Sequence, residues 1–285
     1  MEQSVRVVTD SSCDLPQELV EEYGIEIVPL NVHFGSEEYL DGQLSADEFW
    51  EKAAGPEHPK TSQPSVGRYE EIFARLVAQG KQVLCVTITK EHSGTFNAAR
   101  LAAERFGEAV KVFDSLSASL GEGLQAVAAA QAARAGSSMQ EILSMLKGMR
   151  ESTCLVAVLD TLKNLRLGGR ADAFITAAER MTRALNIKLI ITAVQGHLRP
   201  WGAARSLKGG IRRLLNAVEQ VGPLERLAVI HTRSLDKAQD LADRLAKLTG
   251  YPRESILVQE IGAALASHAG PGVVGVVAVP VRGKG

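Results

Sequence analysis

The stretch Val5-Arg6-Val7-Val8-Thr9-Asp10-Ser11-Ser12-Cys13-Asp14-Leu15 is typical of a strand that ends at an aspartate, a serine turn and a helix start. In parallel α/β sheets, ligands bind beyond the carboxyl ends of the strands, so Asp10 and Ser11 lie at a candidate binding edge. A plainer interpretation is that Asp10 and Asp14 only hold the turn and cap the helix. Both interpretations stay open at this point.

The same alternation of strand and helix continues through the first half of the chain. Short β-branched runs occupy 5–9, 25–32, 83–88 and 110–113, and helical patterns begin near Leu15, Ser45, Ser65, Ser93 and Ser119. Parallel sheets with helices on both faces produce this order. We therefore predict an α/β fold whose N-terminal domain is a three-layer α/β/α parallel sheet.

The pattern changes after Cys154, where strand-like runs occupy 155–158, 187–194, 227–231, 256–261 and 273–279. The dipeptide Gln195-Gly196 separates two extended runs and predicts a β-hairpin, which makes the second sheet mixed. We expect two domains, an N-terminal α/β domain over 1–152 and a C-terminal α/β domain with a mixed sheet over 153–285.

Composition excludes several classes of function. The 285 residues carry 32 Lys and Arg against 33 Asp and Glu, a formal charge of −1, so no global field favours nucleic acid. The three cysteines form no C-x-x-C pair and indicate a reducing compartment. The start of the chain lacks a signal-like apolar core, and no run approaches the roughly 18 apolar residues of a membrane helix. We expect a cytoplasmic protein without stable membrane insertion, and the spacing of its histidines predicts no metal site.

Three turns that are far apart in the sequence are rich in hydroxyls and glycine. They are Thr61-Ser62-Gln63-Pro64-Ser65, His92-Ser93-Gly94-Thr95 and Ser267-His268-Ala269-Gly270-Pro271-Gly272. The first two place hydroxyls and free backbone N–H groups at predicted helix starts, where anions are stabilised, and the third adds an imidazole. Together they predict a receptor for one anionic group. Phosphate, a sugar acid and an acyl oxyanion all fit.

Familiar catalytic motifs are missing. Leu167-Gly168-Gly169-Arg170 lacks the pattern of a phosphate-binding P-loop, and neither G-x-G-x-x-G after the first strand nor G-x-S-x-G occurs. An acyl hydrolase is nevertheless an alternative, with Ser93 or Ser62 as nucleophile, His268 as base and Asp10 orienting the base. The missing nucleophile elbow counts against it.

Seven segments in order give the chain a resemblance to the DegV family over essentially its whole length. These segments are Thr9 to Leu15, Thr61 to Ser65, Ser93-Gly94-Thr95, Asp114-Ser115, Gly168-Gly169-Arg170, Asn186-Ile187-Lys188 and His268 to Gly272. The chain departs from the family's usual pattern at His92, Phe96 and Leu189, and these departures bear on the shape of the pocket.

The resemblance implies a lipid-binding protein that is not itself an enzyme. Two α/β domains would enclose a long-chain fatty acid such as palmitate and present its carboxylate to a separate ATP-dependent fatty acid kinase, without any cofactor. The head group would be bound by Thr61, Ser62, Ser93, Gly94, Thr95 and His268, with Arg170, Asp10 and Ser11 as further head-group or kinase contacts. A sugar or small-ketone binder with a covalent adduct on His268 is a third class, suggested by the fold expected of dihydroxyacetone kinases.

Overall fold

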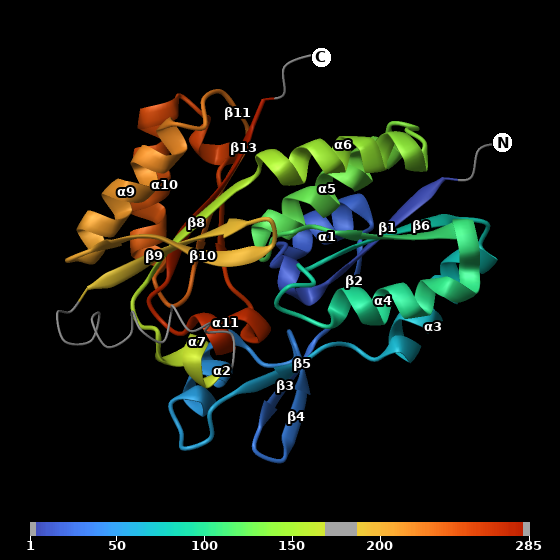
Figure 1. The fold of residues 1–285 in the computed structure, drawn as a ribbon, viewed down its shortest axis with the longest axis horizontal. Helices are drawn as coiled ribbons and strands as arrows, with labels where there is room; N and C mark the ends of the chain where they lie inside the picture. Colours follow the sequence, from blue (N-terminus) through green and yellow to red (C-terminus); the bar gives the residue numbers. More distant parts are fainter. Residues whose placement is uncertain (1–3, 169–186, 282–285) are drawn as a thin grey trace.

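The computed structural model describes residues 4–168 and 187–281, and its elements form alternating layers of helices and sheets (Figure 1). The first sheet, sheet A, has the strand order β2-β1-β6-β7, and all of its pairings are parallel. Its strands are β1 (Val5–Asp10), β2 (Glu26–Val28), β6 (Gln82–Thr87) and β7 (Val110–Asp114).

Helices cover both faces of sheet A, as the sequence predicts. On one face, buried aromatic and alanine side chains of α3 (Val66–Ala78) and α4 (Thr95–Ala103) pack against Val8 and Val83. On the other face lie α5 (Leu120–Arg134) and α6 (Met139–Ser152), with α1 (Gln17–Tyr23) packed beside α5. The predicted three-layer α/β/α arrangement is confirmed.

The second large sheet, sheet C, has the strand order β10-β9-β8-β13-β11-β12. It is mixed, because β11 pairs with β12 in parallel and the other neighbours pair antiparallel. Its strands are β8 (Cys154–Leu159), β9 (Lys188–Val194), β10 (His197–Ala204), β11 (Leu224–His231), β12 (Leu257–Glu260) and β13 (Val274–Pro280). The predicted hairpin is confirmed, with Gln195 and Gly196 both at positive φ in the turn between β9 and β10.

Helix α5 lies between the two sheets and belongs to a core that they share. All residues from Leu120 to Ala130 are buried, and the core around them includes Leu84 and Val86 of sheet A and Val277 of sheet C. The far face of sheet C is covered by α9 (Leu207–Glu219) and α10 (Leu235–Thr249). A helix that is buried on every side ties the two halves of the chain together.

The sequence did not predict a third, small sheet. In sheet B, β3 (Asn31–Phe34) pairs antiparallel with both β4 (Glu37–Leu40) and β5 (Lys60–Ser62), and α2 (Ala46–Ala53) follows β4. The single strand expected over 25–32 was wrong, because Pro29 separates β2 of sheet A from β3 of sheet B. Proline has no N–H for a ladder, so the chain turns there into a different sheet.

Buried carboxyl groups gather at the end of β1. Asp10 accepts hydrogen bonds from the backbone N–H groups of Ser12 and Ile88, each at 3.0 Å. Glu122 of α5 accepts from the hydroxyl of Thr9 at 2.8 Å and from that of Ser12 at 3.1 Å. These bonds join the end of β1 to β6 and to α5.

Stability is predicted to fall as pH rises. Burial raises the pKa of Asp10 to about 6 and that of Asp14 to about 8, and also raises the pKa values of the neighbouring Asp41 and Glu122. The folded chain keeps these protons, whereas the unfolded chain releases them above about pH 4. The contribution of the protonated forms is therefore complete below about pH 4 and is lost as pH rises through the folded pKa values.

Thermal unfolding midpoints between pH 4.5 and 8.5 test this. We expect Asp14→Asn to reduce the slope over the whole range up to about pH 8, and Asp10→Asn to reduce it only below about pH 6, so the interval between pH 6 and 8 distinguishes the two variants. A midpoint that rises across this range in the unchanged protein would contradict the prediction.

Candidate functional site

A pocket lies where sheet B, the loops after β6 and β7, and one end of sheet C meet. Its empty volume is about 700 Å³, counting the part that is open to solvent. Most of its lining is apolar and comes from both halves of the chain: Leu30, Ile88, Ala118, Leu155, Leu165, Ala193, Leu198, Ala264 and Leu265.

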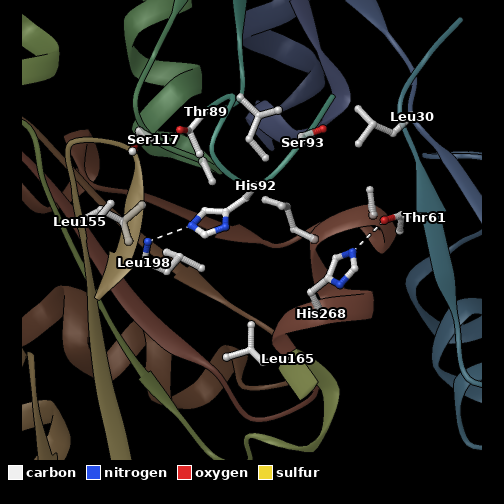
Figure 2. Close-up of a pocket in the computed structure, with 16 residues that line it drawn as sticks. Leu30, Thr61, Thr89, His92, Ser93, Ser117, Leu155, Leu165, Leu198 and His268 are labelled. Atoms are coloured by element: carbon white, nitrogen blue, oxygen red, sulfur yellow. Dashed lines mark hydrogen bonds between the residues drawn. The ribbon is translucent and has the colours of Figure 1, made fainter. Parts of the chain in front are cut away.

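Polar side chains gather on one side of this pocket. His268, near the end of α11 (Ala263–Ala269), and Thr61 of β5 point toward each other in Figure 2, and Thr61 Oγ1 lies 2.7 Å from His268 Nε2. Ser93, in the loop that precedes α4, lines the same pocket. The structure thus brings together one residue from each of the three turns that the sequence singled out.

Glycines allow the close packing around His268. Gly270 and Gly272 have φ values of 75° and 83°, which only glycine adopts readily, and the Gly270 carbonyl accepts a hydrogen bond of 2.7 Å from Thr232 Oγ1. Gly168, at the end of α7 (Lys163–Leu167), lies against the imidazole, and a Cβ atom added there would be 2.1 Å from His268 Nδ1. The imidazole is therefore held by its surroundings on both sides.

The first two turns support each other. A Cβ atom added to Gly94 would lie 2.5 Å from Oε1 of Gln63, so the Gln63 amide packs directly on the backbone at Gly94. Ser93 Oγ lies 2.8 Å from Thr95 Oγ1 and accepts a hydrogen bond from Thr95 N at 3.2 Å. Gly94 and Thr95 thus shape the loop, and His92 and Ser93 are the members of this turn that line the pocket.

The structure places Ser62 apart from the pocket lining. Strand β5 alternates, so Thr61 faces the pocket whereas Ser62 is exposed. Ser62 Oγ lies 3.2 Å from Asn31 Nδ2 and 3.0 Å from His33 Nε2, both on the neighbouring β3.

The residues of the first motif lie behind the pocket. Asp10 is fully buried and holds the N–H group of Ile88, which is part of the lining. Ser11 Oγ donates to Asp41 Oδ2 at 2.7 Å and accepts from the N–H group of Leu30 at 3.0 Å. Arg170 lies outside the described residues.

His92 also lines the pocket, and no motif in the sequence indicates its partner. Its Nε2 atom accepts a hydrogen bond of 2.9 Å from the N–H group of Leu198 in the β9–β10 hairpin, as Figure 2 shows. Gly196 in the hairpin turn lies so close to Thr89 that an added Cβ atom would be 2.4 Å from its Oγ1 atom. The hairpin therefore forms one wall of the pocket by docking on the loop after β6.

This arrangement suits an amphiphile with an anionic head. Two hydroxyls and an imidazole at one side can donate hydrogen bonds to an anion, and the apolar lining can enclose a hydrocarbon. Within residues 4–168 and 187–281, no group of three His, Cys, Asp or Glu side chains is arranged to hold a metal ion. No helix in the same ranges has the length and apolar character needed to span a membrane.

Comparisons with known proteins agree with this geometry. A DegV domain-containing protein of Deinococcus radiodurans is 35% identical over 281 residues, which cover 98% of this chain and 99% of the relative. The fatty-acid-binding DegV family protein of Thermus thermophilus shares 30% identity at a TM-score of 0.87, covering 98% of this chain and all of that one. A stearic-acid-binding protein of Eubacterium ventriosum shares 26% identity at a TM-score of 0.85, covering 97% of this chain and 98% of that one.

The sequence profile of the DegV family, described as a family of uncharacterised proteins, matches residues 4–281, which is nearly the whole chain. The order of the motifs, the parallel sheet A, the mixed sheet C and a pocket lined by both halves of the chain agree with this match. The chain belongs to the DegV family.

Proposed function

We propose that this protein binds a long-chain fatty acid such as palmitate between two lobes, 1–152 and 153–285, with the carboxylate against Thr61, Ser93 and His268. The observation that carries the proposal is that these three donors line one largely apolar pocket, with Thr61 and His268 in contact. The fatty acids bound by the proteins from Thermus thermophilus and Eubacterium ventriosum support it.

The tail supplies most of the affinity. Burial contributes about 0.8 kcal/mol per methylene, so a palmitate-length chain gains on the order of 10 kcal/mol before the cost of lost freedom, which is several kcal/mol. The head group mainly fixes the orientation, because a buried carboxylate must be hydrogen-bonded or it becomes protonated. An imidazolium at His268 would keep it ionised, and the position of His268 in the last turn of α11 favours positive charge.

The remaining predicted site residues take supporting roles in this proposal. Gly94 and Thr95 hold the Ser93 loop, and Ser62 fixes β5 against β3, so that Thr61 faces the ligand. We propose that the ionised carboxylate is then presented to an ATP-dependent fatty acid kinase, where a carboxylate oxygen attacks the γ-phosphate and ADP leaves. Asp10 and Ser11 support the site from behind the lining, through Ile88 and Leu30, and Arg170 is kept as a further head-group or kinase contact.

The hydrogen bonds around the site favour binding over acyl hydrolysis. Asp10, the proposed orienter, accepts from Ser12 and Ile88, and His268 pairs with Thr61, while Ser93 pairs with Thr95. A hydrolytic triad instead needs the nucleophile, base and orienter bonded in series. A nitrophenyl-ester assay with Ser93→Ala as control separates the two functions, because a binding protein shows no turnover that depends on Ser93.

The identity of the ligand can be tested directly. Native mass spectrometry of the purified protein should show a co-purified adduct with the mass of a C16 to C18 fatty acid.

The role of His268 gives the first prediction for this site. We expect His268→Ala to weaken palmitate binding roughly 10- to 100-fold, since hydrogen bonds to a charged group are worth about 1.5–3 kcal/mol. Acyl-phosphate formation with the kinase should be lost even at saturating palmitate. A hydrophilic ligand, a covalent adduct on His268 or unchanged turnover would contradict the proposal.

The close packing of Gly168 on His268 gives a second prediction. The added methyl of Gly168→Ala would lie 2.1 Å from Nδ1, so the ring must shift from the position in which it contacts Thr61. We expect palmitate affinity, measured by calorimetry, to fall about tenfold, which corresponds to the loss of one hydrogen bond to the carboxylate. Gly67→Ala in α3 is the matched control, because a Cβ atom there meets no atom within 4 Å. Equal affinities in the two variants would show that the His268 position is unimportant.

The end of the pocket across from Thr61 gives a prediction about which acyl-chain lengths bind best. Ser117 and Ala193 line both this pocket and a second one, and Leu155 beside them lies across the pocket from Thr61 in Figure 2. We propose that the tail points there, so that Ala193→Phe shortens the space. Each excluded methylene should weaken palmitate binding about fourfold, so palmitate should lose its advantage over laurate. The same change at the exposed Ala203 of β10 is the control, and an unchanged order of affinities at Ala193 would place the tail elsewhere.

A further inference from the structure

Helix α11, which carries His268, begins against two carboxyl groups from the other half of the chain. The N–H group of Gly262, the residue that precedes the helix, donates to Asp14 Oδ1 at 2.8 Å. The N–H group of Ala264, in the first turn, donates to Asp41 Oδ1 at 3.1 Å. N–H groups in a first helical turn have no partner within the helix, so these carboxyl groups satisfy donors that would otherwise be orphaned.

Each carboxyl group is fixed in turn by a serine of the N-terminal half. Ser119 Oγ donates to Asp14 Oδ2 at 2.5 Å, and Ser11 Oγ donates to Asp41 Oδ2 at 2.7 Å. Asp14 itself is held in the left-handed backbone region, with φ at 49°, which Asp tolerates better than most residues. The N-terminal half of the chain therefore fixes the positions of the two acceptors independently of α11.

The other end of α11 is held within its own half of the chain. Thr232 Oγ1 donates to the Gly270 carbonyl at 2.7 Å, and Asn164 Nδ2 donates to the Ser267 carbonyl at 3.4 Å. His268 then meets Thr61, which belongs to sheet B in the N-terminal half. The helix thus crosses the seam, the boundary between the N-terminal and C-terminal halves of the chain. The distance of His268 from Thr61 therefore depends on what holds the first turn of α11.

We infer that Asp14 and Asp41 are positioning residues of the fatty-acid site, which accept hydrogen bonds from the first turn of α11 and so place His268 against Thr61. This inference rests on the proposed function. It gives a role to the Asp10–Asp14 motif that the pocket lining does not account for. The same motif also reaches the lining through the bonds of Ser11 to Leu30 and of Asp10 to Ile88.

Placement and burial agree with a positioning role. The two carboxyl groups accept hydrogen bonds at the start of α11 and His268 lies in its last turn, so they act on the start of the helix rather than on the ligand at its end. Burial raises the pKa of both groups, and the nearby Asp41 adds to the rise in the pKa of Asp14. Such a pair is costly to bury, which is reasonable where it orients a functional helix.

The test compares three variants by calorimetry with palmitate. We expect Asp41→Ala to weaken binding about tenfold, and Asp41→Asn to retain most of the affinity because its amide oxygen can still accept from Ala264 N. Asp47→Ala is the matched control. It removes one negative charge and a contact across the same seam, the exposed ion pair with Arg233, but leaves α11 untouched. Equal losses in Asp41→Ala and Asp47→Ala, or no loss in either, would overturn the inference.

A double-mutant cycle separates positioning from general stability. If Asp41 acts through His268, then Asp41→Ala should cause little further loss of affinity in the His268→Ala background. The His268 ring signals in a ¹⁵N-histidine NMR spectrum without ligand should also shift in Asp41→Ala and stay unchanged in Asp47→Ala. Additive losses, or an unshifted His268, would overturn the inference. A protein that binds no palmitate in its unchanged form would instead refute the proposed function.

The variant Asp14→Ala is the second test of the pair. Asp14 is more buried than Asp41, so the thermal unfolding of this variant protein is measured first. If it folds, it should repeat the affinity loss and the His268 shift of Asp41→Ala, and unchanged values would overturn the part of the inference that concerns Asp14. If it does not fold, the less buried Asp41 still decides the role of the pair.

Discussion

The structure depends on the burial of α5 between two sheets. Leu120 to Ala130 are buried on every side of the helix, and Leu84 of sheet A and Val277 of sheet C belong to the same core. The two halves are therefore not separate bodies joined by a linker, because opening them would expose apolar surface on both sheets. A site built at their seam can rely on fixed distances between residues more than 200 positions apart, such as Thr61 and His268.

The pocket forms where this shared core ends. Beyond the carboxyl ends of β6 and β7, the loops after these strands, sheet B, α11 and the β9–β10 hairpin enclose the space. Apolar side chains of the core continue into its lining, while the turns contribute the hydroxyls and the imidazole. A cavity that inherits its walls from the core and its polar groups from loops is suited to a ligand with one charged end.

Patterns that act over short distances were read correctly from the sequence, and those that depend on tertiary pairing were not. The parallel sheet, the mixed sheet and the hairpin at Gln195-Gly196 follow from periodicity and turn chemistry. Sheet B was missed, because its strands are short and Pro29 looks like an interruption rather than a change of sheet. The motif at 61–65 could not show which hydroxyl faces the pocket, since that depends on how β5 pairs with β3. His92 and Asp41 meet backbone donors more than 100 residues away, and no local signal marks such partners.

The first motif shows how a structural and a functional interpretation can describe the same atoms. Asp10 does hold the turn after β1, as the plainer interpretation expects, because its Oδ1 atom accepts from Ser12 within that turn. The Asp14 side chain does not cap the following helix: α1 has Pro16 at its N-cap, and the two Asp14 oxygens accept from Ser119 and from Gly262 at the start of α11. Asp10 needs only one of its carboxyl oxygens for its own turn, and its second oxygen holds Ile88, which lines the pocket. The interpretations are therefore not alternatives: the turn can position the site only because it is itself held rigid.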